Sequence, residues 1–359
     1  MEPALSSVLL VFAHVAAVLG AGLAYFRRVR IERPPIGVYN LRDVLGMAVV
    51  LVIMPPLYLH IPDAAVLAVL TTVVTAVLYF TLSPLLGRPW GTGAAVALVA
   101  ADLGLGLWDR PGHLAAFLAL NNLLMVAAAV GVTNVWVQSG IQAREVALLA
   151  AGLAVYDMLA TVVTPTMVEF FNRVAALPLT PVVSWGRGAG TVGVGLGDLL
   201  LIAVWTLVVE RTFGRRAGLA AAGGCLLVVL AVDMGFWLDL VNRPVPAMVL
   251  LGPVIVGHFA LLRRRPRRTT EQYFAALAGE PLPAPRGARS ADLAAALRLV
   301  EPNGGGPARY LAVVDGQVVA SAATPGEAVR AAGAAMETLG ASPGAVPTLV
   351  LSTAETTRP

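Results

Sequence analysis

Apolar residues fill long, nearly continuous blocks of the chain, without the three- or four-residue spacing of an amphipathic helix. A helix needs about 20 apolar residues to cross roughly 30 Å of hydrocarbon, so blocks of this length indicate transmembrane helices. Nine such blocks span approximately residues 4–26, 44–61, 64–86, 91–108, 113–137, 144–166, 190–210, 217–239 and 245–262. The pattern predicts an all-α polytopic membrane domain over residues 1–262, with nine transmembrane helices.

The overall composition agrees with a membrane protein. Hydrophobic residues make up 58% of the 359 positions and charged residues only 13%, whereas soluble domains carry about 25% charged residues. The mean hydropathy is +0.79. No basic residue precedes the first block, and Arg27 and Arg28 follow it, so we expect a retained helix and not a signal peptide.

Arginine supplies all 25 basic residues, and its distribution predicts the orientation of the chain. Connections rich in arginine stay on the cytoplasmic side of a membrane. Fifteen arginines lie in the connections that follow odd-numbered blocks, and four lie in those that follow even-numbered blocks. This bias predicts a multi-pass protein of the cell membrane with its N-terminus outside and its C-terminus in the cytoplasm.

Beyond residue 262 the sequence reads as a soluble tail. Residues 263–308 are predicted to be a basic linker that contains Pro, Gly and short helices. After it, two strand-like stretches flank Asp315 and Gly316, a dipeptide that favours a type I′ hairpin turn, and a capped helix and a last strand follow. Residues 309–359 are therefore predicted to form a small α+β module of ββαβ order. Binding of a cytoplasmic partner or presentation of a substrate is a hypothesis for this module.

Cysteine, histidine and net charge argue against several kinds of site. Cys225 is the single cysteine and the four histidines are scattered singly, so we expect no disulfide, no metal site and no cofactor. The net charge of +4 comes from arginines at the predicted membrane edges. The lipid bilayer is therefore the expected partner of these arginines, and nucleic acid is not.

Four carboxylates lie well inside the apolar blocks: Asp102, Asp157, Asp198 and Asp233. An ionisable residue in the middle of a membrane costs about 2.5–3.5 kcal/mol even on the lenient insertion scale, so each one needs a partner or a function. Asp102 is expected to pack between helices, with Asn121 or Asn122 on the next block as its partner. The role of Asp233 stays open.

Asp157 and Asp198 lie on the consecutive sixth and seventh blocks, which run antiparallel, so their side chains can meet. Two carboxylates that are close together in a low dielectric cannot both ionise, and they hold one proton between them. One then acts as a base toward water while the other donates a proton to a peptide carbonyl. The pair therefore predicts the chemistry of an aspartic protease.

Glycines surround the second aspartate. Gly195 and Gly197 flank Leu196 directly before Asp198. Within a membrane helix, glycines permit close backbone approach or a local departure from helical geometry. Backbone groups that are freed in this way are available to an extended substrate strand.

Three short motifs resemble, in order and in position, those of the presenilin and signal peptide peptidase family of GxGD intramembrane aspartyl proteases. They are Tyr156-Asp157 in the sixth block, Gly195-Leu196-Gly197-Asp198 in the seventh and Pro246-Ala247-Met248 in the ninth. The resemblance covers residues 4–262 and implies that Asp157 and Asp198 are the catalytic pair. It also implies that the Pro246 segment shapes the site, and it leaves Tyr156 either as a packing aromatic or as a contact of the pair. The arginine-only, alanine-rich composition suggests a prokaryotic member.

The resemblance implies an endopeptidase that hydrolyses peptide bonds within transmembrane segments. Presenilins and signal peptide peptidases place the loop between helices six and seven on opposite sides of the membrane. The arginine count puts residues 167–189 outside, which is the signal peptide peptidase arrangement. Transmembrane peptides of type II orientation, or signal-peptide-like segments, are the substrates that this implies.

Three other functions remain open. Four membrane aspartates would also suit the relay of a proton-coupled transporter or channel, and a noncatalytic membrane scaffold would have the same fold. A prepilin peptidase also uses a membrane GxGD motif, but a basic residue usually follows it soon after. Leu199, Leu200 and Leu201 follow Asp198 here, so this function ranks lower.

Overall fold

The structure is a computed structural model of the whole chain, which divides into two compact units, Met1–Leu282 and Pro283–Pro359. It describes residues 5–30, 41–108, 112–164, 166–186, 191–238, 240, 247–265, 267–268, 270–278, 309–314, 317–322, 327 and 348–352.

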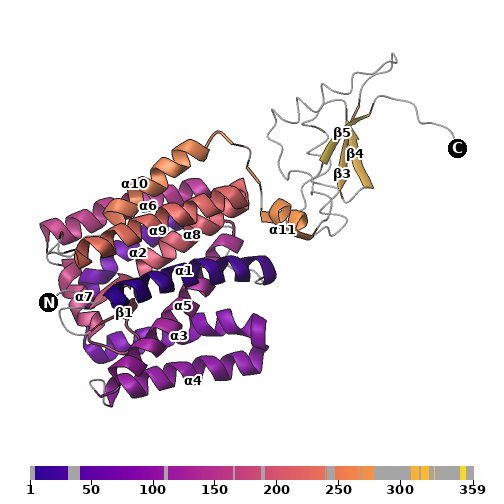
Figure 1. Cartoon of the computed structure of the whole chain (residues 1–359). Coiled ribbons are helices and arrows are strands. Elements are labelled where there is room, and N and C mark those ends of the chain that lie inside the picture. The colour runs from indigo at the N-terminus through magenta and orange to yellow at the C-terminus, as the bar shows by residue number, and fades with distance from the viewer. Residues whose placement is uncertain are drawn as a thin grey trace. The chain divides into compact units, whose positions relative to one another are not determined.

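The first unit is a bundle of α-helices (Figure 1). Each predicted apolar block corresponds to one of its longer helices. These are α1 (Leu5–Arg28), α2 (Leu41–Tyr58), α3 (Asp63–Leu86), α4 (Arg88–Leu107), α5 (Leu114–Gln138), α6 (Ala143–Met158), α8 (Leu196–Phe213), α9 (Arg215–Trp237) and α10 (Ala247–Leu262). The described residues of this unit also form two shorter helices, α7 (Thr166–Ala175) and α11 (Thr270–Ala278).

Five of these helices are, by length and composition, able to cross a membrane: α1, α3, α4, α5 and α9. They indicate a multi-pass membrane protein. In the other four blocks the regular helix is shorter or more polar. α6 has 16 residues and α10 has 16, and α8 contains Asp198, Glu210 and Arg211.

Tryptophans mark the two ends of α4. Trp90 and Trp108 are 77% and 93% exposed. Their separation of 18 positions corresponds to about 27 Å of helix, close to the thickness of the hydrocarbon core. Exposed tryptophans at this spacing are typical of the aromatic belts at the two membrane–water interfaces.

The core of the bundle lies around α8. Its side chains are buried almost continuously from Leu199 to Thr212, and Trp205 at its middle is fully buried. α1, α5, α6 and α9 pack around it. By contrast, much of α2 is apolar and exposed, as expected of a helix that faces lipid.

The bundle departs from the predicted continuous helices at the sixth and seventh blocks. Regular helix α6 ends at Met158, and a π-helical turn, η1 (Leu159–Val163), continues it to a break before α7. The seventh block begins as a strand, β2 (Val192–Gly195), which pairs antiparallel with β1 (Val182–Trp185). Alternating Val and Gly suit a strand with one buried face, so α8 starts about six residues later than the apolar pattern predicts.

Helix α11 packs against the ends of α1 and α8. Its Tyr273 hydroxyl donates to Glu210 Oε1 at 3.0 Å, and Arg27 forms an ion pair with the same oxygen at 2.6 Å. The rings of Tyr273 and Phe26 stack at 5.2 Å. The segment that follows the last apolar block is therefore anchored to the bundle.

The second unit contains a three-stranded antiparallel sheet of order β4-β3-β5, made by β3 (Arg309–Val314), β4 (Gln317–Ala322) and β5 (Thr348–Ser352). All three strands were predicted from the sequence. The turn residues Asp315 and Gly316 and the helix expected between β4 and β5 lie outside the described residues, apart from Glu327.

Candidate functional site

Three helix ends meet at the two aspartates of the predicted pair. Asp157 is in the last turn of α6, Asp198 is in the first turn of α8, and α10 begins beside them. The Asp157 carboxylate interacts electrostatically with Asp198. Both aspartates are half-buried, so the pair is accessible from outside the protein core.

Asp198 is held by the start of its own helix. It is the third residue of α8, and Gly195 is the N-cap. The backbone N–H of Gly195 lies close to the Asp198 carboxylate and stabilises its negative charge. A helix N-terminus also favours negative charge there.

Asp157 is held by two neighbouring elements. The backbone N–H of Met248, the second residue of α10, donates to its carboxylate. This N–H is among the first of the helix, which have no partner within the helix itself. The Thr161 hydroxyl, on η1, donates to Asp157 Oδ1 at 3.4 Å. The positive ends of two helices therefore point at the two carboxylates.

Gly252 allows α10 to approach α6 closely. A Cβ at this position would lie 2.6 Å from the Cβ of Ala154 and 3.0 Å from the carbonyl oxygen of Ala150. Only glycine fits such a separation. One turn earlier on the same helix, Met248 reaches Asp157, so the contact between α6 and α10 fixes this hydrogen bond.

Two asparagines of α5 hold strand β1. The Asn122 amide accepts from the N–H of Ser184 at 3.0 Å and donates to its C=O at 2.9 Å, as a neighbouring strand would. The Asn121 amide donates to the C=O of Thr180 at 3.2 Å and of Val182 at 3.0 Å. One edge of β1 is thus occupied by side chains, and the other edge pairs with β2.

The outer edge of the hairpin is consequently that of β2. The backbone N–H and C=O of Ser184 face Asn122. Backbone groups alternate in direction along a strand, so those of Val183 and Trp185 face β2. Their partners on β2 are Val194 and Val192. The backbone groups of Gly193 then point away from β1. Gly193 is exposed, and a Cβ on the exposed Gly197 would meet no atom within 4 Å. The backbone of β2 is therefore exposed at Gly193, and there is open space beside Gly197, next to Asp198.

The other predicted site residues that the structure describes lie on the same elements as the pair or on α10. Tyr156 donates its hydroxyl to the C=O of Val52 in α2 at 3.2 Å. The Leu196 N–H donates to the C=O of Pro181 at 2.8 Å. Ala247 is half-buried as the first residue of α10. Pro246 lies outside the described residues.

The two remaining membrane carboxylates are also buried. Asp102 accepts a hydrogen bond from the backbone N–H of Leu179 at 2.8 Å, and Leu179 has a left-handed φ of 55°. Asn121 and Asn122, the predicted neighbours of Asp102, bind the same segment a few residues further along the chain. All three side chains therefore hold β1 and the residues before it in place. Asp233 on α9 is 3% exposed.

Sequence reasoning missed the parts of the site that support the two aspartates. The hairpin, Thr161 and Gly252 were not predicted, and the asparagines were assigned to Asp102 only. Two consecutive buried amides in an apolar block were a usable signal, because an amide in lipid or core needs backbone or side-chain partners.

No group of three or more His, Cys, Asp or Glu side chains arranged to hold a metal occurs among the described residues. Neither a known protein-family model nor a curated protein matches the chain.

Proposed function

We propose that this protein is an intramembrane aspartyl endopeptidase that uses Asp157 and Asp198 to hydrolyse peptide bonds in transmembrane segments. One observation carries the proposal: the two carboxylates come from different helices, interact electrostatically and each lie beside a backbone N–H at a helix N-terminus. The order of the three motifs, which resembles that of the presenilin and signal peptide peptidase family, adds to this support.

The reaction follows from one proton shared by two carboxylates. The ionised aspartate takes a proton from water as the water oxygen attacks the carbonyl carbon of the substrate. The protonated aspartate gives its proton to the carbonyl oxygen, and a gem-diol forms. In the second step the two aspartates exchange roles: the one that took the proton from water gives it to the amide nitrogen as the C–N bond breaks, and the other takes a proton from a gem-diol hydroxyl. An acid and an amine leave, and each aspartate returns to its starting protonation state.

The backbone N–H groups of Gly195 and Met248 serve this chemistry because they keep a negative charge tolerable away from bulk water. They also orient the two carboxylates before substrate arrives. Preorganised donors of this kind cost no reorganisation during the reaction.

A substrate helix must unwind before it can be cut, because its peptide bonds are shielded by its own hydrogen bonds. The outer edge of β2 offers backbone groups to an unwound segment, by addition of a strand to the hairpin. The space beside Gly197 leads such a strand to Asp198. We propose this edge as the place where the substrate backbone binds.

The proposed topology has nine membrane crossings, with the N-terminus outside and the C-terminus in the cytoplasm. It rests on the arginine distribution and on the nine helices that match the apolar blocks. Substrates of type II orientation and signal-peptide-like segments fit this topology. The C-terminal sheet then lies in the cytoplasm, where it is proposed to bind a protein partner.

The test uses the purified full chain in lipid nanodiscs with a panel of type II transmembrane peptides. Wild type is expected to cleave at least one peptide and, in water enriched in ¹⁸O, to place the label in the new carboxyl terminus. Asp157→Asn and Asp198→Asn keep the side-chain shape and should lower the rate by about 10²–10⁴-fold or more, the usual contribution of a general acid or base.

Asp233→Asn is the matched control, because it removes a buried membrane carboxylate that is not part of the pair. Cleavage by this variant should equal that of wild type. If wild type cleaves no peptide and all three variants alter proton flux into liposomes, the protein is a proton-coupled transporter and the protease proposal fails. If neither activity is found, the noncatalytic scaffold remains.

A further inference from the structure

Helix α2 contains two consecutive prolines, Pro55 and Pro56, near its end. Proline has no N–H, so Pro56 leaves the carbonyl of Val52, four residues earlier, without its helical partner. The Tyr156 hydroxyl donates to this carbonyl at 3.2 Å. The residue directly before Asp157 therefore fills a gap in the hydrogen bonding of α2.

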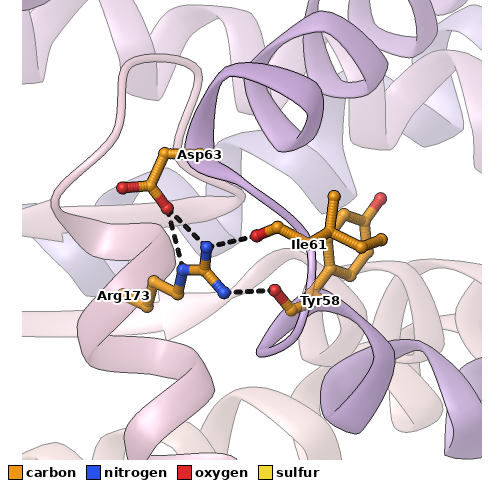
Figure 2. Close-up of polar contacts among 4 residues, drawn as sticks. All are labelled: Tyr58, Ile61, Asp63 and Arg173. Atoms are coloured by element: carbon orange, nitrogen blue, oxygen red, sulfur yellow. Dashed lines mark hydrogen bonds and ion pairs between the residues drawn. The ribbon is translucent and has the colours of Figure 1, made fainter.

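A second contact holds the end of the same helix. Arg173 of α7 donates to the carbonyl oxygens of Tyr58 and Ile61, in the turn that ends α2, and through two nitrogens to Asp63 Oδ1 at 2.8 and 2.7 Å. Figure 2 shows the guanidinium between these three acceptors. The planar fork of arginine suits such an arrangement, and lysine could not reproduce it.

Apart from these contacts, α2 is only loosely packed. It packs mainly against α6 and α7. Seven of its large apolar side chains are exposed: Leu45, Val49, Val50, Leu51, Val52, Ile53 and Leu57. The two polar contacts therefore join a lightly packed helix to the segment α6–η1–α7, one just before Asp157 and the other 16 residues after it.

We propose that Tyr156 and Arg173 are positioning residues, which fasten the proline-interrupted end of α2 to both sides of the Asp157 segment and thereby set where the Asp157 carboxylate lies. The π-helical turn between them explains the need for two contacts. A π-helix is a weakly stable element, and Thr161, which donates to Asp157, lies within it. Fixing α6 and α7 to one external helix holds this turn. The catalytic consequence rests on the proposed protease function, but the structural role does not.

The structural role is tested by distances. Leu57 on α2 and Phe171 on α7 are 43% and 45% exposed, so each offers an accessible place for a spin label. The pair Leu57→Cys and Phe171→Cys is made in a Cys225→Ala background, which removes the single natural thiol. Pulsed electron spin resonance in nanodiscs should give a narrow distance distribution, and Arg173→Gln should broaden it. An unchanged distribution would overturn the proposal.

The Tyr156 contact is tested by a double-mutant cycle. Pro56→Ala restores an N–H that can donate to the Val52 carbonyl within the helix. Tyr156→Phe should therefore lower the free energy of unfolding much less in the Pro56→Ala background than in wild type. Pro55→Ala is the matched control, because its missing N–H concerns Leu51 and not Val52. If Tyr156→Phe lowers the free energy of unfolding equally in wild type, Pro56→Ala and Pro55→Ala, the proposed Tyr156 contact is refuted.

The positioning role is tested by cleavage kinetics of the same variants. Arg173→Gln and Tyr156→Phe should lower kcat by roughly 10- to 100-fold, the cost of misplacing a catalytic group by up to about 1 Å, with KM changed less than about twofold. Arg173→Lys should not restore kcat, since it cannot reach all three acceptors. A broadened distance with an unchanged kcat would contradict positioning, whereas a broadened distance in a wild type that cleaves nothing would contradict only the protease function.

Discussion

The backbone N–H of Met248, at the start of α10, donates a hydrogen bond to the carboxylate of Asp157, in the last turn of α6. This contact joins two apolar blocks that are about 90 residues apart in the chain. It gives the start of α10 a physical task that needs no particular side chain at position 248. The donor is the backbone, so the hydrogen bond itself does not depend on the methionine side chain.

The close approach of α10 to α6 predicts a strong effect of a single methyl group. Gly252→Ala would bring a Cβ to 2.6 Å from Ala154, so the helices must separate and the Met248 hydrogen bond must lengthen. We expect a loss of about 1–3 kcal/mol in the free energy of unfolding and a lower kcat. Gly257→Ala, on the same helix with no atom within 4 Å, is the control and should leave both unchanged. Equal stability of the two variants would contradict the close approach.

The open space beside Gly197 predicts a variant that folds but does not cleave. A Cβ at this exposed position meets no atom within 4 Å, so we expect Gly197→Leu to keep the unfolding temperature of wild type. It would occupy the proposed path of the substrate backbone, so kcat/KM should fall by about 100-fold, an energy of about 2.7 kcal/mol. Gly20→Leu, an exposed glycine of α1 with no neighbour within 4 Å, serves as the control. Full cleavage by Gly197→Leu would exclude this path.

Asn122, which binds β1, and Asn134, which does not, should differ in their effect on activity but not in their effect on stability. Asn122→Ala leaves the N–H and the C=O of Ser184 without this partner and should destabilise the protein by about 1–3 kcal/mol. Asn134→Ala removes a similarly buried amide, which binds Gly22 and Val130 far along the chain from the hairpin, and should cost about as much stability.

Only the first of these two asparagine variants should impair catalysis, because only Asn122 holds β1, the strand that pairs with β2 directly before Asp198. The measurement is the cleavage rate per folded molecule, with the folded fraction taken from circular dichroism. Similar rates for Asn122→Ala and Asn134→Ala would show that the hairpin does not need this support.

The contact of α11 with Glu210 predicts a pH-dependent attachment of this helix. Burial raises the pKa of Tyr273 from 10.0 to about 12, and the nearby Glu210 adds to the shift. The docked state therefore favours the neutral phenol. Docking is at full strength below pH 10.0 and weakens as the pH rises toward about 12. The reason is that the Tyr273 phenol ionises at a lower pH when α11 is released than when it is docked.

Two measurements check this prediction. The ultraviolet absorbance of phenolate, as the difference between wild type and Tyr273→Phe, should show Tyr273 titrating above the exposed tyrosines. Glu210→Ala should lower the free energy of unfolding by about 1–3 kcal/mol, because it removes the acceptor of the Tyr273 hydroxyl and the partner of Arg27. A Tyr273 that titrates near 10.0 would mean that α11 is not docked.

The sequence by itself determined the apolar helices and singled out the two aspartates. Long apolar blocks specify helices without reference to neighbours, since a backbone in lipid must satisfy its own hydrogen bonds. The boundaries of α3, α5 and α9 lie within two residues of the predicted ones for this reason. Asp157 and Asp198 could be recognised because a carboxylate in such a block is costly unless it has a purpose.

Only the tertiary structure decided how the ends of these helices are used. Val192–Gly195 is apolar enough to continue α8, but it forms a strand because β1, which the asparagines of α5 hold on its other edge, lies beside it. The donors to Asp157, the close approach at Gly252 and the contacts of Arg173 with α2 all join segments that are distant in the chain. Hydropathy reports the preference of each residue for lipid or water, whereas these contacts depend on which elements become neighbours, and only the folded chain specifies that.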